Sequence, residues 1–134
     1  MEDFVTYEQA EKLADLGFDY KCIACYNEEE FDYTGEYSNY NLGYYHDNLI
    51  SAPNIYQAQK WLREKHDIIV LVDTYFKNYM NEDFSKAEFE YVIVDMNNNA
   101  LRKASHENKE LFEFYENALS AGISKAIEYI EEND

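Results

Sequence analysis

The stretch that decides the fold is Ser51-Ala-Pro-Asn-Ile-Tyr-Gln-Ala-Gln-Lys-Trp-Leu-Arg-Glu-Lys-His-Asp67, which continues directly into Ile68-Ile-Val-Leu-Val72. It contains the only proline, Pro53, and the only tryptophan of the chain. Proline suits a first helical turn, and Asn54 and Gln57 have the spacing of a helix cap. We therefore expect a capped helix that leads into a strand over Asp67–Val72. Because that strand is apolar on both faces, we expect it to be central in a sheet.

The N-terminal part of the chain has the signals of a second helix. Thr6 and Gln9 have the spacing of a capping box, and Gly17 occupies the place of a glycine that closes a helix. These signals predict a helix over Tyr7–Leu16, followed by a strand over Tyr20–Tyr26.

Two further elements are predicted in the C-terminal half. Phe89–Val94 has the pattern of a strand, and it would pair in antiparallel fashion with Asp67–Val72 across a connector near Asn78–Lys86. Apolar residues at helical spacing predict a long helix from about Glu107 to Glu131. Gly122 lies inside its apolar stripe, which indicates that another backbone, either the sheet or another helix, approaches closely there.

Residues 31–50 have no sustained period and are rich in Tyr, Asn and Gly. We expect a long loop, which could contain a loose hairpin. The five tyrosines of this segment are our candidate interaction residues, and they could either form a contact surface or lie over the core of the domain: Tyr33, Tyr37, Tyr40, Tyr44 and Tyr45.

These elements together predict the α+β class in a single domain over residues 1–134. The expected architecture is a small antiparallel sheet of about three strands with helices packed on one face, in the order α-β-loop-α-β-β-α.

The bulk composition limits the classes of partner. The chain has 134 residues with 14 tyrosines, and its formal net charge is −17. Such a charge disfavours direct binding to nucleic acids and to anionic membranes, and it favours a basic partner protein or simply solubility. No signal peptide or run of about 20 apolar residues is visible, so we expect a cytoplasmic protein with reduced thiols.

Residues that could carry chemistry have structural explanations. Cys22 and Cys25 have CxxC spacing, but in a strand residues three apart point to opposite faces, so we expect buried, inert thiols. Three histidines show no zinc-protease spacing: His46, His66 and His106. The carboxylate pairs Glu82/Asp83 and Glu88/Glu90 could hold a hard cation, but a solvated acidic rim is favoured. We therefore predict no catalytic residue, metal site or cofactor.

Parts of the chain resemble a known group of proteins. The stretch from Ser51 to His66, the stretch Tyr115–Ile123 and the N-terminal Tyr-Glu-Gln-Ala with Leu-Gly-Phe-Asp are similar to small uncharacterised proteins of Bacteroidetes genomes, phages and mobile elements. The resemblance covers under half of the chain, and its motifs are structural. It implies an accessory role in a mobile element and assigns no functional residue.

Three hypotheses follow. The first is a non-enzymatic accessory protein whose acidic, tyrosine-bearing surface binds a partner protein, with mimicry of nucleic acid as a special case. The second is a small hydrolase or nuclease that uses carboxylates and a divalent metal. The third is a structural component that associates with itself.

Overall fold

The computed structural model describes residues 3–43, 48–75, 88–98 and 101–133. Within them the chain is α+β, which confirms the predicted class, and it contains two antiparallel sheets of three strands each. The sequence predicts one sheet. The chain divides into two compact units, Met1–Trp61 and Leu62–Asp134. The prediction of a single domain stays a prediction.

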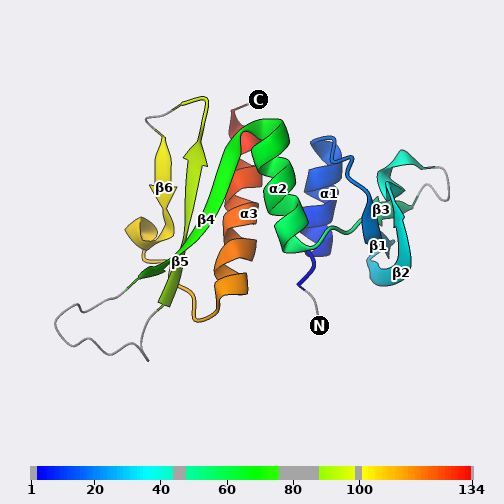
Figure 1. Ribbon diagram of the computed structural model, residues 1–134, viewed down its shortest axis with the longest axis horizontal. Helices are drawn as coiled ribbons and strands as arrows, with labels where there is room; N and C mark the ends of the chain where they lie inside the picture. The colour runs from blue at the N-terminus through cyan, green and yellow to red at the C-terminus, as the bar shows by residue number, and fades with distance from the viewer. Residues whose placement is uncertain (1–2, 44–47, 76–87, 99–100, 134) are drawn as a thin grey trace. The chain divides into compact units, whose positions relative to one another are not determined.

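Unit 1 is the part of the chain from the N-terminus to Trp61. Its helix α1 spans Tyr7–Asp15, and its sheet has the strand order β2-β1-β3. The strands are β1 (Cys22–Asn27), β2 (Glu30–Ser38) and β3 (Leu49–Ser51), with the short helix η1 (Tyr40–Leu42) between the last two. Helix α2 (Ile55–His66) begins in this unit and ends in the other (Figure 1).

Both ends of α1 are closed as predicted. The side chain of Thr6 accepts a hydrogen bond from the backbone of Gln9, and the side chain of Gln9 accepts one from the backbone of Thr6. At the other end Gly17 has a φ of +96°, and the backbone N–H of Phe18 donates to the carbonyl of Leu13 at 2.9 Å. These bonds satisfy helix-end groups that would otherwise lack a partner.

Helix α2 begins where its cap predicts, with one difference. The Asn54 side chain accepts from the backbone N–H of Gln57 at 2.8 Å, so Asn54 is the N-cap and Ile55 the first helical residue. Pro53 therefore lies just before the helix and not in its first turn. Its carbonyl accepts from the backbone N–H of Val5 at 3.0 Å, and this bond ties the N-terminal segment to the start of α2.

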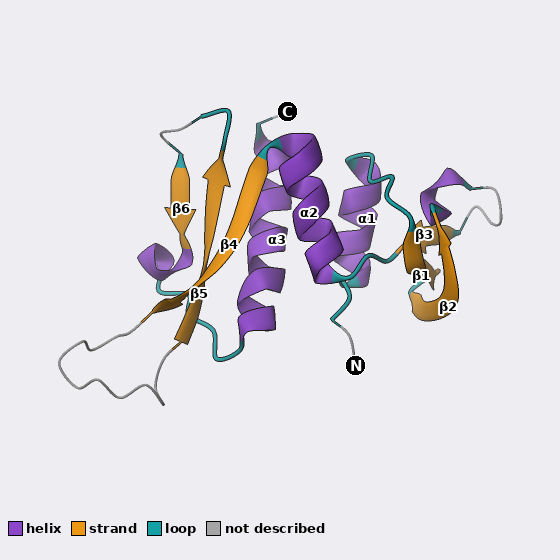
Figure 2. Cartoon of the chain, viewed as in Figure 1, coloured by secondary structure: helices purple, strands orange, loops and turns teal. Residues whose placement is uncertain are grey.

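Unit 2 is one sheet with one long helix. Its strands, in the order β4-β5-β6, are β4 (Ile68–Tyr75), β5 (Glu88–Asp95) and β6 (Arg102–Ala104). The short helix η3 (Ser105–Asn108) follows β6, and α3 (Tyr115–Glu132) packs along β4 and β5 (Figure 2). The predicted antiparallel pair is confirmed, with Val70 opposite Ile93. Its connector lies mostly outside the described residues.

Two predictions for unit 2 are wrong. The sequence predicts that the strand at Ile68–Val72 is central, but β5 lies between β4 and β6, and Leu71 on β4 is exposed. The last helix begins at Tyr115, whereas the prediction places its start near Glu107. The segment before α3 is held by β5 instead, because Phe89 and Phe112 exchange two backbone hydrogen bonds of 2.7 and 2.8 Å.

Gly122 confirms the close approach that the sequence predicts, and the partner is the sheet. A Cβ atom at this position would lie 2.6 Å from Val70 Cγ1 and 2.9 Å from Tyr91 Cβ. Only glycine lets α3 pack this closely against β4 and β5. The face of the sheet that carries Val70 and Tyr91 is therefore the covered face.

Candidate protein-binding surface

Strand β2 is the most exposed element of the described chain. It forms one edge of the sheet in unit 1, because it pairs with β1 and no other described strand lies on its outer side. Its nine residues are exposed except for the partly exposed Ser38. An edge strand presents unpaired backbone N–H and C=O groups, which makes it a template for a further strand.

The side chains of β2 alternate between two kinds at its start. Phe31 and Tyr33 are 44% and 57% exposed, and they point to the face opposite to Glu30 and Asp32. Tyr37, near the end of the strand, is 67% exposed. We call the set formed by β2 side chains the β2 surface: Glu30, Phe31, Asp32, Tyr33, Glu36 and Tyr37. Over Glu30–Tyr33 it presents aromatic area on one face of the strand and negative charge on the other.

The aromatic part of the β2 surface is held by neighbouring rings. The ring centroid of Phe31 lies 4.8 Å from that of Phe4 and 5.6 Å from that of Tyr26, while Tyr33 lies 6.4 Å from Phe4. Tyr26 is itself fixed, since its hydroxyl donates to the carbonyl of Val5 at 2.6 Å. Side chains that are already ordered lose less entropy when a partner binds.

A bulge interrupts the strand after Tyr33. The pairing passes from Ala24 opposite Tyr33 to Cys22 opposite Ser38, so residues 34–37 face one residue of β1. Gly35 has a φ of +79°, which favours glycine, and Thr34 donates from its hydroxyl to the carbonyl of Ile23 at 3.0 Å. Bulges of this kind protect edges against uncontrolled pairing, so the regular edge is limited to Glu30–Tyr33.

The structure separates the five candidate tyrosines. Tyr33 and Tyr37 are exposed, whereas Tyr40 is buried and its hydroxyl donates to the carbonyl of Glu36 at 2.6 Å. Tyr44 and Tyr45 lie outside the described residues. The loop predicted for residues 31–50 is replaced by β2, η1 and the start of β3 where the chain is described. Phe31 was not among the predicted residues, although its alternation with acidic neighbours was visible in the sequence.

A pocket of about 380 Å³ in unit 1 is lined in part by negatively charged side chains. Tyr7, Glu28, Glu29, Asn48 and Ile50 line it, and two of these residues lie in the turn between β1 and β2. Partial burial raises the pKa of Tyr7, and the carboxylates of Glu11, Glu29 and Glu28 raise it further. The surroundings of this turn therefore disfavour anions and favour cations.

The cysteines are buried, as predicted. Cys22 and Cys25 are free thiols inside unit 1. Burial raises the pKa of Cys22 to about 12, against the opposite effect of a hydrogen bond with Ser51, and burial also raises the pKa of Cys25. Neither thiol is suited to act as a nucleophile or a metal ligand at neutral pH. The relative direction of the two thiols stays a prediction.

The histidines and carboxylates that the sequence offers as candidates lie partly inside and partly outside the described residues. His66 is the last residue of α2, whereas His46 and the pair Glu82/Asp83 lie outside the described residues. Glu90 is buried in β5 and contacts His106, a pairing that the sequence did not predict. Among residues 3–43, 48–75, 88–98 and 101–133 no group of three or more potential ligands could hold a metal ion.

Comparison of the chain with protein-family models, with curated proteins and with solved structures gave no match. In the described parts of the chain, every helix is too short or too polar to cross a membrane.

Proposed function

We propose that the protein is an accessory protein that binds a partner protein, and that the β2 surface adds an extended, basic segment of that partner to the sheet of unit 1. The observation that carries this proposal is the exposure of β2 along an edge of the sheet, with Phe31, Tyr33 and Tyr37 presented to solvent. Strand addition uses such an edge, in which backbone bonds supply affinity and alternate side chains supply specificity.

Charge supports a basic partner. The chain carries 28 acidic and 11 basic side chains, and the regular part of the edge includes Glu30 and Asp32. Opposite charges on directly opposed strand positions stabilise pairing, while like charges oppose it. Long-range attraction would also raise the rate of association and make it depend on ionic strength.

The biological setting is part of the same proposal. The resemblance of some sequence motifs to small proteins of Bacteroidetes genomes, phages and mobile elements implies an accessory role in a mobile element, and we include this role in the proposal. The free thiols of Cys22 and Cys25 are compatible with a reducing cytoplasm, where we place the protein. A basic nucleic-acid-binding protein would be one suitable partner, and binding to it would block its nucleic-acid surface.

The test uses random peptides of nine residues, the length of β2. A displayed library is selected on the intact chain and depleted on the Phe31→Ser, Tyr33→Ser double variant. We expect the enriched peptides to be basic, with charged and apolar residues in alternation. A synthetic copy of the best peptide should bind more weakly as NaCl rises from about 50 to about 500 mM. Methylation of alternate backbone nitrogens on the edge-pairing side should abolish its binding, because those N–H groups would pair with β2.

Matched variants distinguish peptide binding at the β2 surface from nonspecific binding to exposed aromatic side chains. The double variant should weaken the peptide by at least about tenfold, or about 1.4 kcal/mol. Tyr56, which is 50% exposed on α2, provides a control, and Tyr56→Ser should leave the affinity unchanged. Failure to enrich any peptide, enrichment of acidic peptides, or equal binding by the double variant would each contradict the proposal.

A further inference from the structure

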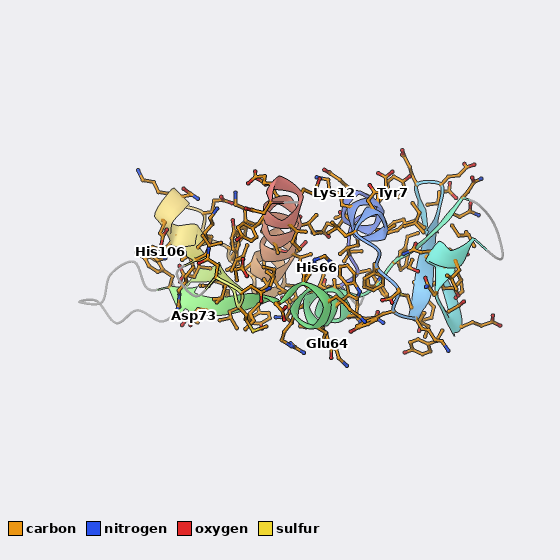
Figure 3. All side chains as sticks on the ribbon, turned by 90° about the horizontal axis from the view of Figure 1, so that it is seen from above. Tyr7, Lys12, Glu64, His66, Asp73 and His106 are labelled. Carbon is orange, nitrogen blue, oxygen red and sulfur yellow. The ribbon has the colours of Figure 1, made fainter. Side chains whose placement is uncertain are left out.

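Unit 2 contains a second arrangement of reactive groups, which is independent of the β2 surface. Glu90, on the central strand β5, is only 7% exposed, and its carboxylate contacts Nδ1 of His106 in η3. The two residues are far apart in the sequence, and the pairing of η3 with the sheet brings them together. Figure 3 shows His106 on this part of the chain.

The imidazole of His106 is held in one orientation. Its ring stacks on the ring of Tyr75, with centroids 4.9 Å apart and planes inclined by 15°. The backbone carbonyl of His106 accepts from the N–H of Lys109 at 2.9 Å, which fixes the turn that carries the histidine. A contact from the carboxylate to Nδ1 leaves Nε2 as the ring nitrogen that can act on a ligand.

Stability alone is a weak explanation for this pair. Glu90 lies next to Tyr91 in the strand, so it points to the face of the sheet opposite to α3. On that face Asp73 of β4 is directly opposite Glu90, and like charges in this position are destabilising.

A pocket adjoins the histidine. It has a volume of about 510 Å³ and is lined by Tyr75, Glu88, His106, Lys109 and Leu111. The volume is in the range of small-molecule sites. Its lining combines the imidazole of His106, an aromatic ring, an aliphatic side chain, the carboxylate of Glu88 and the ammonium group of Lys109. The ammonium group can pair with a negative group of a partly apolar small molecule, while the other end of that molecule contacts the ring and the aliphatic side chain.

We infer that His106 is a general base that hydrolyses a small ester bearing a carboxylate group in this pocket. Glu90 is the positioning residue: it orients the imidazole and stabilises the imidazolium that forms. Lys109 pairs with the carboxylate of the substrate. A histidine oriented through Nδ1 by a carboxylate, with Nε2 toward the reacting atoms, is the arrangement that general base catalysis requires. The inference departs from the sequence-based expectation of a non-enzymatic protein.

The reaction needs only water as a second reactant. Nε2 of His106 takes a proton from a water molecule while the water oxygen forms a bond to the acyl carbon. The bond between that carbon and the leaving oxygen then breaks. The proton on Nε2 passes to the leaving alkoxide, so an acid and an alcohol are released and the imidazole is neutral again.

The test measures release of p-nitrophenolate from mono(p-nitrophenyl) glutarate by the full chain. His106→Gln should lower kcat/KM by about a hundredfold, and Glu90→Gln should lower kcat with little change in KM. Lys109→Met should raise KM for this ester and leave the neutral p-nitrophenyl butyrate unaffected. Thermal unfolding of each variant confirms that it is folded.

His66→Gln is the matched control, because any solvent-accessible imidazole hydrolyses activated esters slowly and His66 is partly exposed. Equal losses in His66→Gln and His106→Gln, or no loss in His106→Gln, would overturn the inference. If the His106 variant does not fold, nitrogen NMR of the native chain at about pH 8 still tests the inference, because it shows which ring nitrogen of His106 carries the proton. Nδ1 should carry the proton of His106, and a proton on Nε2 would overturn the assignment.

Discussion

Cys22 illustrates at the scale of one residue how burial decides chemistry. Its spacing from Cys25 is that of metal and redox motifs, yet its thiol is fully buried in β1. Burial raises the pKa from the ordinary 9.0 to about 12. Because the thiolate is the reactive form, Cys22 is unreactive at neutral pH. Burial is thus the physical reason for the inert thiol that the sequence predicts.

The raised pKa of Cys22 has a consequence for stability at alkaline pH. Above the unfolded value of 9.0 the unfolded chain loses the thiol proton while the folded chain keeps it, up to about 12. The stabilising contribution is therefore complete below pH 9 and is lost as the pH rises. We expect the free energy of unfolding to fall more steeply between about pH 9 and about pH 10 in the native chain than in Cys22→Ala. Urea unfolding followed by Trp61 fluorescence measures both slopes, and equal slopes would contradict the assigned pKa.

Residue identity alone could not separate the tyrosines of the candidate surface. Tyr40 is buried because η1 turns its side chain inward, where the hydroxyl closes the bulge through the carbonyl of Glu36. Tyr33 and Tyr37 are the same residue type and lie in the same stretch of sequence, but their side chains are exposed to solvent. The contact of Glu90 with His106 was equally hidden, because it depends on the place of η3 against the sheet. A charged residue inside the apolar run Phe89–Val94 was its one visible signal.

At the scale of elements, the sequence predicts the helix ends that are fixed by hydrogen bonds between residues close in the chain. The cap of α1 at Thr6 and the cap of α2 at Asn54 form as expected, since each is closed within four residues. The sequence predicts a loop in place of β2, because the alternation of acidic and aromatic residues over Glu30–Tyr33 is short and stops before Gly35. The start of α3 was misplaced because bonds between Phe89 and Phe112 hold the preceding segment against β5.

Helix α3 and its sheet give a prediction at this scale. In Gly122→Ala the added methyl group would overlap Val70 Cγ1 and Tyr91 Cβ, which belong to two strands. Helix propensity favours alanine by about 1 kcal/mol, but overpacking costs about 1–3 kcal/mol. We expect a net loss of about 1 kcal/mol in the free energy of unfolding, measured with urea. Ser124→Ala, at an exposed position of the same helix, should change it by less than about 0.5 kcal/mol. A more stable Gly122→Ala variant would mean that α3 and the sheet can separate freely.

At the scale of the whole molecule, the boundary between the two units falls inside a helix. Helix α2 runs from Ile55 to His66, and the boundary follows Trp61. In unit 1 the Trp61 ring lies 5.3 Å from that of Phe18, and its Nε1 donates to Asp19 at 3.2 Å. In unit 2 the next residue, Leu62, is buried. Independent domains are usually joined by exposed linkers, so a shared helix favours one cooperative structure.

This argument predicts that both units unfold together. Helix formation is cooperative, so loss of the first half of α2 should destabilise the second half, and with it unit 2. Trp61 fluorescence reports on unit 1, and methyl NMR signals of Val92 and Ile123 report on unit 2. We expect the same urea midpoint from all three. Lys60→Gly, at an exposed position of α2, should lower these midpoints together by more than Lys60→Ala does, since glycine costs about 1 kcal/mol relative to alanine. Separate midpoints in the native chain would mean that the single-domain prediction is wrong, and that the β2 surface and the His106 pocket belong to two domains that fold independently.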